Sequence, residues 1–451
     1  MEEKQSQKYR QMTETPVGPL ILRLAVPCMI SMMVTAFYNM ADTFFVGMLK
    51  SNAATGAVGV VFSLMAIIQA VGFFFGQGSG TFISRALGKQ EMDEAATMSA
   101  VGFFSAIGAG VLICIVGQIF LEPLAYLLGS TDTILPHAKA YLSVILLGAP
   151  WMTSSLVLNN QLRFQGSAAY AMVGITSGAI LNVGLDPLFI FSFHLGVAGA
   201  AWATIISQFV SFSVLLLGCS KGGNLMPRIS RFQFSKTYYA NIVKGGLPSL
   251  ARQGFASIST ICLNHAARPY GDVVIAAMSV VQRIMMCGGS AMLGFGQGFQ
   301  PVCGFNYGAK LYDRVKQGFY FCVKTSLVFL LIVGAGIAFF APHLVALFRD
   351  DPEVIACGTA ALRFQCLTFP LLCWVIPSNM MEQTMGRTVP ATFLAIARQG
   401  LFFIPLIWVF SAAWGVRGIQ MTQMVCDLLT FACAIPIHIH VLRTLDSPLK
   451  H

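Results

Sequence analysis

Long apolar segments alternate with short polar connections along almost the whole chain. Each apolar segment has roughly 20 residues or more, enough to cross a bilayer at ~1.5 Å per residue. The pattern predicts twelve membrane-spanning helices, at residues 18–43, 54–80, 96–120, 137–159, 168–193, 196–219, 240–265, 273–300, 317–341, 357–383, 388–412 and 416–442. The longest polar connection, residues 220–239, is expected to link an N-terminal half (1–219) to a C-terminal half (240–451).

The composition agrees with an all-α polytopic membrane protein. Of the 451 residues, 56% are hydrophobic and only 10% are charged, with a mean hydropathy of +0.72. The net charge of +10 arises from basic residues in short connections, which favours membrane topology over nucleic-acid binding as its cause. Residues 1–19 are polar, and we expect a cytoplasmic tail followed by an uncleaved first span.

Basic residues are distributed unevenly between alternate connections. The N-terminal segment and the even-numbered connections hold Lys4, Lys8, Arg10, Arg85, Lys89, Arg163, Lys221, Arg228, Arg231, Lys236, Lys310, Arg314, Lys316 and Arg387. The odd-numbered connections hold only Lys50, Arg268, Arg349 and Arg417. By the positive-inside rule, both termini are predicted to be cytoplasmic, in a cell (inner) membrane.

The distribution of cysteines and the lack of catalytic motifs argue against redox, structural-metal, enzymatic and ATP-driven functions. The twelve cysteines lie mostly within apolar segments and form no C-x-x-C pair, which indicates reduced packing residues and no redox or structural-metal role. The chain has no H-E-x-x-H, G-x-S-x-G or Walker-type motif, so we expect neither an enzyme nor direct ATP use, and no cofactor.

The two halves resemble each other at an offset of about 220 residues. The matching segments are Gly76–Gly78 with Gly296–Gly298, Gly196–Gly199 with Gly415–Gly418, and Pro27 with Pro248. Because each half has six spans, the halves should insert the same way round, as parallel repeats. The expected architecture is two six-helix lobes facing across a central cleft.

The fifth span contains a carboxylate, Asp186, which is costly at the centre of a bilayer. Asn182 lies one helical turn earlier on the same face, and Pro187 cannot bond the carbonyl of Val183. These oxygens predict a binding site for a proton or a small hard cation. The structural alternative is a proline kink with an incidental polar pair.

Several motifs together resemble the multidrug and toxic compound extrusion (MATE) transporters, in particular their DinF-like prokaryotic branch. The matching residues are Tyr38, Asn39 and Asp42 in Y-N-x-x-D, Asn182, Asp186 and Pro187 in N-x-x-x-D-P, Tyr141 in the fourth span, and Thr204 after G-V-A-G-A-A. The resemblance covers nearly the whole chain, and it implies that the glycine repeats form loops after the second and eighth spans. It implies export of bulky, often cationic compounds, driven by inward movement of H⁺ and/or Na⁺.

Asp42 and Asp186 are expected to share one pocket in the N-terminal half. Two carboxylates in a low-dielectric pocket cannot both be ionised cheaply, so at least one should hold a proton. Tyr141, Asn182 and Thr204 would add neutral oxygens, and Na⁺ could be held instead by Asp42, Asn182, Asp186 and Thr204. Pro27 and Pro187 are the expected hinges. Alternatively, Asp42 lies at the outer end of its span and is hydrated.

The C-terminal half lacks counterparts of these acids and has other intramembrane charges: Arg252, Arg283, Glu382 and Arg398. One interpretation pairs Glu382 with Arg398 or Arg252 as a structural ion pair. The other places Arg252, Glu382 and Arg398 at the cleft, where arginine would favour anionic substrates. The second interpretation fits a flippase or exporter of an anionic or lipid-linked compound.

Further substrate contacts are expected from polar groups near the cleft. Tyr38 and Asn39 precede Asp42, and Asn159 and Asn160 close the fourth span, although this polar pair could also mark the membrane boundary. The expected partners are small organic molecules and the bilayer. Since one chain supplies both lobes, we expect a monomer.

Overall fold

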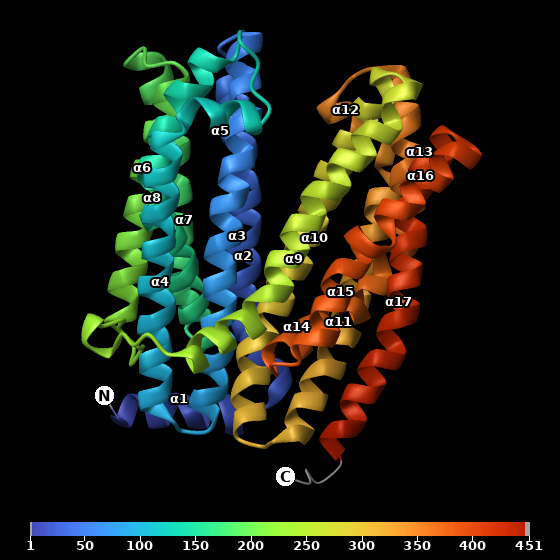
Figure 1. Ribbon diagram of the computed structural model, residues 1–451. Coiled ribbons are helices and arrows are strands. Elements are labelled where there is room, and N and C mark those ends of the chain that lie inside the picture. Colours follow the sequence, from blue (N-terminus) through green and yellow to red (C-terminus); the bar gives the residue numbers. More distant parts are fainter. Residues whose placement is uncertain (1, 447–451) are drawn as a thin grey trace.

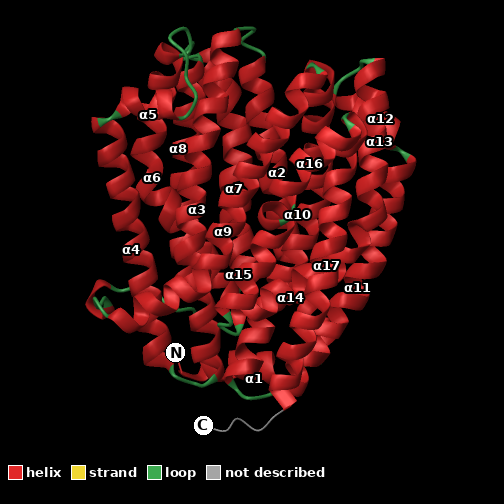
Figure 2. Cartoon of the chain, turned by 45° about the vertical axis from the view of Figure 1, so that its right-hand side comes forward, coloured by secondary structure: helices red, strands yellow, loops and turns green. Residues whose placement is uncertain are grey.

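The computed structural model describes residues 2–446, and this part of the chain contains helices and connections without strands (Figure 2). The N-terminal half comprises α1 (Glu2–Glu14), α2 (Val17–Gly47), α3 (Asn52–Gly88), α4 (Met92–Ile119), α5 (Leu121–Leu127), α6 (Leu135–Phe164), α7 (Ala168–Pro187), the π-helix η1 (Leu188–Ser192) and α8 (Val197–Cys219). The linker carries the short 3₁₀-helix η2 (Ile229–Arg231).

The C-terminal half follows a similar order of elements. It comprises α9 (Lys236–Ala267), η3 (Arg268–Tyr270), α10 (Asp272–Gly308), α11 (Tyr312–Phe339), α12 (Ala341–Phe348), α13 (Pro352–Thr368), η4 (Phe369–Leu371), α14 (Leu372–Thr384), α15 (Thr388–Ile396), the π-helix η5 (Ala397–Leu401), α16 (Phe403–Trp414) and α17 (Val416–Asp446).

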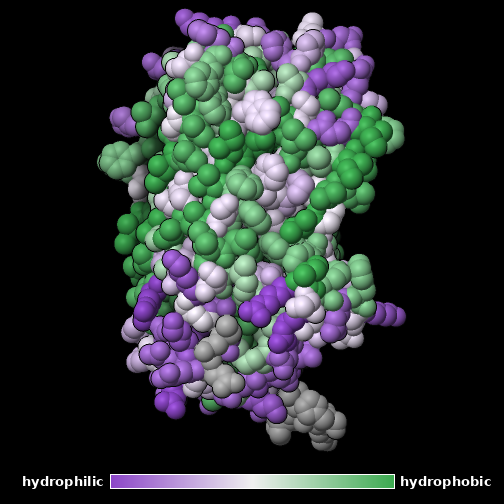
Figure 3. Space-filling model, turned by 90° about the vertical axis from the view of Figure 1, so that its left-hand side faces the viewer, coloured by the Kyte–Doolittle hydropathy of each residue, from purple (hydrophilic) through white to green (hydrophobic). Residues whose placement is uncertain are grey.

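Within residues 2–446, eleven helical segments are long and apolar enough to cross a membrane. The predicted seventh span, α9, is not among these eleven segments. Its polar residues, which include Lys244 and Arg252, make it less apolar than the others. This helix has 32 residues and packs against α3, and we treat it as the twelfth span. On the face shown in Figure 3, a broad hydrophobic band separates two hydrophilic ends, as expected for a protein that crosses a membrane. The chain is a multi-pass membrane protein.

The helices form two bundles that diverge from the end of the molecule carrying both termini (Figure 1). At that end the bundles join through two helix crossings, α3 with α9 and α2 with α10. Both crossings are close because glycine leaves room for the neighbouring backbone. A Cβ on Gly78 would lie 2.3 Å from the carbonyl oxygen of Ile242, and one on Gly298 would lie 2.3 Å from Cα of Ala25.

The expectation that the glycine repeats form loops was wrong. Gly76–Gly78 lies inside α3 and Gly296–Gly298 lies inside α10, and both helices continue to the next polar turn. Glycine weakens an isolated helix by about 1 kcal/mol, but here it permits backbone contact between helices. The repeat therefore marks where the two halves meet.

The N-terminal segment also differs from the expected tail, because Glu2–Glu14 form the helix α1. This helix lies across the end of the molecule (Figure 1) and contacts both halves. Lys8 Nζ donates to Ser167 Oγ at 2.8 Å and to Asn224 Oδ1 at 2.6 Å. From the other half, Asn306 Nδ2 donates to the carbonyl oxygen of Met12 at 3.1 Å.

Three predicted spans are interrupted by non-α turns. The fifth changes to the π-helix η1 directly after Pro187, and the eleventh contains the π-helix η5. The tenth is broken by η4, which contains Pro370. Proline lacks the N–H that would continue the α-helical bonding pattern, which accounts for the interruptions at η1 and η4.

Candidate functional site

Five polar residues predicted to act together converge inside the N-terminal bundle. Asp42 lies on α2, Tyr141 on α6, Asn182 and Asp186 on α7, and Thr204 on α8, and all five are buried. Tyr141 Oη donates to Asp42 Oδ2 at 3.5 Å, and Asn182 Nδ2 donates to Thr204 Oγ1 at 3.4 Å. The carboxyl groups of Asp42 and Asp186 lie within hydrogen-bonding reach of each other, and this bond forms when one of them carries a proton. We call these residues the acidic cluster.

With both carboxyl groups ionised, four oxygens of the acidic cluster accept from no hydrogen-bond donor. They are Asp42 Oδ1, Asn182 Oδ1 and both carboxyl oxygens of Asp186. Across residues 2–446, neither carboxylate forms an ion pair with a lysine, arginine or histidine. Buried acceptors normally find a donor or a cation, so this arrangement is chemically suited to take up a proton or to coordinate a small cation.

The two predicted hinge prolines lie on helices that carry the acids of this cluster. Pro187 is the last residue of α7 and immediately follows Asp186, so the helix changes geometry directly after the acid. Pro27 lies inside α2, the helix that carries Asp42 and packs against both α7 and α10. The hinge roles of Pro27 and Pro187 stay predictions.

A cavity of about 70 Å³ lies beside the acidic cluster within the same bundle. Tyr38 lines it and hydrogen-bonds with Gln208 of α8. The remaining polar lining includes Thr35, Gln69, Ser155 and Ser211, among apolar residues such as Met65, Ile68 and Met152. Asn39 is half-buried on the same helix and makes a polar contact. The mixed polar and apolar walls resemble those of small-molecule sites, but pockets that enclose a drug-sized molecule have roughly 300–1,000 Å³, so this cavity is too small to enclose one in this arrangement.

The predicted contacts Asn159 and Asn160 take part in helix packing. Asn159 Nδ2 donates to the carbonyl oxygen of Ala171 at 3.3 Å. Asn160 is fully buried, and its Oδ1 accepts from Gln77 at 3.1 Å and from Arg163 at 2.6 Å. In this arrangement both side-chain amides form hydrogen bonds within the N-terminal bundle. A substrate role for them stays a prediction.

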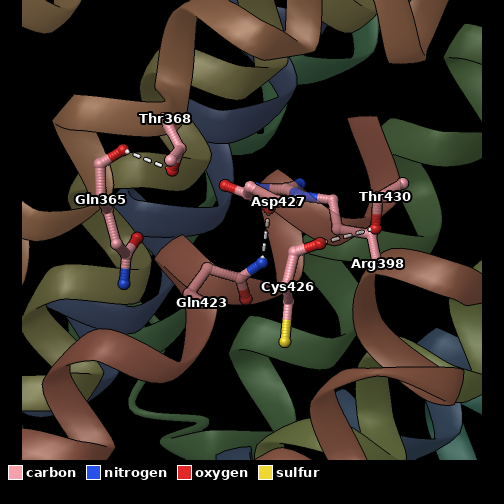
Figure 4. Close-up of polar contacts among 7 residues, drawn as sticks. All are labelled: Gln365, Thr368, Arg398, Gln423, Cys426, Asp427 and Thr430. Carbon is pink, nitrogen blue, oxygen red and sulfur yellow. Dashed lines mark hydrogen bonds and ion pairs between the residues drawn. The ribbon is translucent and has the colours of Figure 1, made fainter. Parts of the chain in front are cut away.

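The predicted pairing of Glu382 with Arg398 or Arg252 was wrong. Glu382 Oε1 lies 3.3 Å from His438 Nδ1, and both side chains are fully buried. Arg398 Nε donates to Asp427 Oδ1 at 2.6 Å (Figure 4). The sequence could not decide these partners, because the register between α14, η5 and α17 depends on tertiary packing. Arg252 on α9 is half-buried.

Sequence reasoning missed Asp427, His438 and Gln208. Asp427 was detectable by the same criterion as Asp186, since it is a carboxylate inside a predicted apolar span. His438 lies near a predicted membrane edge, and its burial against Phe319, with ring centroids 4.0 Å apart, is a tertiary feature. Gln208 carries no sequence signal beyond being polar within a span.

The MatE family model matches the chain twice, at residues 27–188 and at residues 248–409. The multidrug export protein MepA of Staphylococcus aureus (strain NCTC 8325 / PS 47) is 25% identical over 431 residues, covering 95% of both chains. MepA of Staphylococcus haemolyticus (strain JCSC1435) is 25% identical over 419 residues, covering 92% of this chain and 91% of that protein.

Two solved structures show the same fold over nearly the whole length. One is the outward-facing conformation of a multidrug resistance MATE family transporter of the MOP superfamily, with TM-score 0.91 and 26% identity, covering 97% of this chain and 98% of the other. The second, from Pyrococcus furiosus, is a MOP superfamily transporter with a binding pocket of reverse polarity, with TM-score 0.91 and 25% identity, covering 98% and 99%. The family match and the fold together show that this chain belongs to the MatE family of membrane transporters.

Proposed function

We propose that this protein is a secondary active exporter of bulky, often cationic organic compounds, driven by inward movement of H⁺ and/or Na⁺. The observation that carries the proposal is the acidic cluster, in which two buried carboxyl groups lie beside each other and, within residues 2–446, neither forms an ion pair with a basic residue. The multidrug export activity named for the staphylococcal MepA proteins supports the substrate class.

The ion would act at Asp42 and Asp186. A proton taken up by one carboxyl group removes a negative charge from the low-dielectric interior, and the remaining carboxylate can accept its hydrogen bond. Na⁺ would use the same oxygens together with Asn182 and Thr204. Each elementary charge that crosses the membrane supplies about 2.3 kcal/mol per 100 mV, enough to bias an equilibrium between two lobe arrangements.

Alternating access would follow from the two-bundle architecture. Residues 1–219 and 240–451 would act as two lobes joined by the linker 220–239, and the close crossings at Gly78 and Gly298 would be the contacts that separate when the molecule changes state. We place both termini on the cytoplasmic side of the cell membrane, following the positive-inside rule. The crossings then close the cytoplasmic side in this arrangement. A single chain supplies both lobes, which favours a monomer.

The substrate would contact Tyr38 and the polar lining of the adjoining cavity, which would have to widen to hold a bulky compound. This cavity lies near the acidic cluster, so ion binding and substrate binding can affect each other. Protonation or Na⁺ binding changes the charge that a cationic compound meets there. Export of an anionic or lipid-linked compound is the second candidate. Arg252 supports it, because no carboxylate within residues 2–446 forms an ion pair with this arginine.

The test uses purified protein in lipid vesicles loaded with a fluorescent lipophilic cation, under an imposed pH or Na⁺ gradient. We expect gradient-dependent efflux for the wild type and its loss in Asp186→Asn. Asp350→Asn is the matched control, because this carboxylate is exposed in the connection before α13. Efflux that ignores both gradients, or persists in folded Asp186→Asn, would reject the acidic cluster as the coupling site.

A further inference from the structure

The C-terminal bundle contains a charged cluster that the acidic cluster does not explain. Arg398 of η5 and Gln423 of α17 both donate to Asp427 Oδ1, at 2.6 Å and 2.8 Å (Figure 4). Asp427 is 2% exposed, whereas the Arg398 side chain is 30% exposed. The carboxylate is therefore enclosed, and its cationic partner lies on the accessible side.

The position of this pair limits what its accessible side faces. Asp427 is eleven residues into α17, ~16 Å along the helix axis, and thus far from either end of that span. A charged side chain exposed to hydrocarbon at such depth is costly, and such groups almost always face a bundle interior or water. The exposed part of Arg398 is accordingly expected to face a water-filled region of the transporter.

The internal repeat relates this pair to the site in the N-terminal bundle. Gly196 before α8 and Gly415 before α17 have nearly the same backbone angles, φ 58° and ψ −133° against φ 59° and ψ −133°. The residue twelve positions after each glycine is Gln208 in the first half and Asp427 in the second. Gln208 lines the cavity of the N-terminal bundle, so Asp427 occupies the equivalent position in the other bundle.

Neighbouring positions repeat the same correspondence. Eight residues after the glycine, Thr204 of the acidic cluster corresponds to Gln423, which contacts Asp427. Fifteen residues after it, the cavity residue Ser211 corresponds to Thr430. Both bundles therefore carry a polar stripe on the same helix face, and only the second contains a carboxylate with its own countercharge.

We propose that Asp427 is a second recognition site for organic cations, and that Arg398 is an internal counter-ion which an incoming cation displaces. This inference rests on the proposed export of cations and adds a substrate contact in the C-terminal half. While Arg398 is paired with Asp427, the site is electrically neutral, and no external cation is required to balance the carboxylate. When a cation takes its place, the freed guanidinium moves to the water-facing side, where it remains hydrated.

Two substitutions separate recognition from a purely structural pair, because recognition predicts effects of opposite sign. Arg398→Gln removes the competitor, and the Kd for tetraphenylphosphonium should fall by roughly threefold or more, the scale of one partly exposed charge pair. Asp427→Asn removes the carboxylate, and this Kd should rise by a similar factor. Arg398→Lys keeps the competing charge and is expected to stay near the wild-type Kd.

Binding is measured in detergent without any gradient. A failure of ion coupling then leaves this readout intact, so the two proposals fail separately. Thermal unfolding of each variant identifies loss of fold. Gln423→Leu is a second test of the same idea, because removing this hydrogen-bond donor to Asp427 should lower the Kd, as Arg398→Gln does. Parallel weakening in both charge variants, or an unchanged Kd in both, would overturn the inference.

Discussion

Gly78 on α3 lies directly against the backbone carbonyl of Ile242 on α9, where a Cβ would come within 2.3 Å of the oxygen. The two residues belong to different halves of the chain, so this contact helps to hold the halves together at the end of the molecule that carries both termini. A backbone oxygen cannot move aside as a flexible side chain can, and even one methyl group must push the helices apart.

We predict that Gly78→Ala weakens this crossing and shifts the molecule toward the arrangement open at that end. Overpacking of this kind typically costs about 1–3 kcal/mol. Cysteine pairs across α3 and α9 should crosslink less efficiently in the variant. Gly108→Ala on α4 is the control, because a Cβ there meets no atom within 4 Å. Equal crosslinking in all three proteins would contradict the prediction.

Docking of α1 should depend on pH through Lys8. Burial lowers the pKa of this lysine from 10.5 to about 8. Because the docked state binds the proton more weakly than the released state, docking is penalised fully below pH 8, and the penalty disappears as the pH rises from about 8 toward 10.5. Protection of α1 against proteolysis should increase over that range.

Replacing Lys8 by Met should flatten this pH profile, since the titrating group is gone. Lys4→Met is the matched control, because Lys4 is exposed on the same helix, and its profile should follow the wild type. The explanation fails if the Lys8→Met profile keeps the wild-type slope between pH 8 and 10.5.

The hydroxyl of Thr204 should matter for both stability and coupling. Thr204→Val keeps the side-chain shape but removes the oxygen that accepts from Asn182 Nδ2 at 3.4 Å. We expect a loss of about 1 kcal/mol in the free energy of unfolding and weaker ion dependence of transport. Thr204→Ser retains the hydroxyl and should keep coupling. If Val and Ser behave alike in the vesicle assay, the hydroxyl is not an ion contact.

Glu382 and His438 should be energetically coupled. Both are fully buried, and each has one polar atom, Glu382 Oε2 and His438 Nε2, without a partner. Removing one residue leaves the other's polar group buried alone, so the second substitution should cost less than the first. A double-mutant cycle of Glu382→Ala and His438→Ala, followed by thermal unfolding, should give a coupling of about 0.5–3 kcal/mol. Additive effects would show that the contact contributes nothing.

The sequence by itself determined the membrane class, the positions of the spans, and the intramembrane acid Asp186 with Asn182 one helical turn before it. Hydrophobic segments must match the bilayer thickness, and backbone groups within it must bond inside one helix, so local composition decides these features. An acid in an apolar span is similarly conspicuous, which is why Asp186 could be named in advance, whereas Tyr141 and Thr204 were named through the family resemblance. The same criterion applies to Asp427, which was overlooked.

Only the tertiary structure decided which side chains meet. Arg398 could have paired with Glu382 as far as the sequence was concerned, but helix register brings it to Asp427 and brings Glu382 to His438. Likewise, the glycines of the repeat look like loop residues in isolation, and only the neighbouring backbone explains their place inside α3 and α10. Contacts between helices depend on rotations of a few tens of degrees about each axis, and local sequence preference does not encode those rotations.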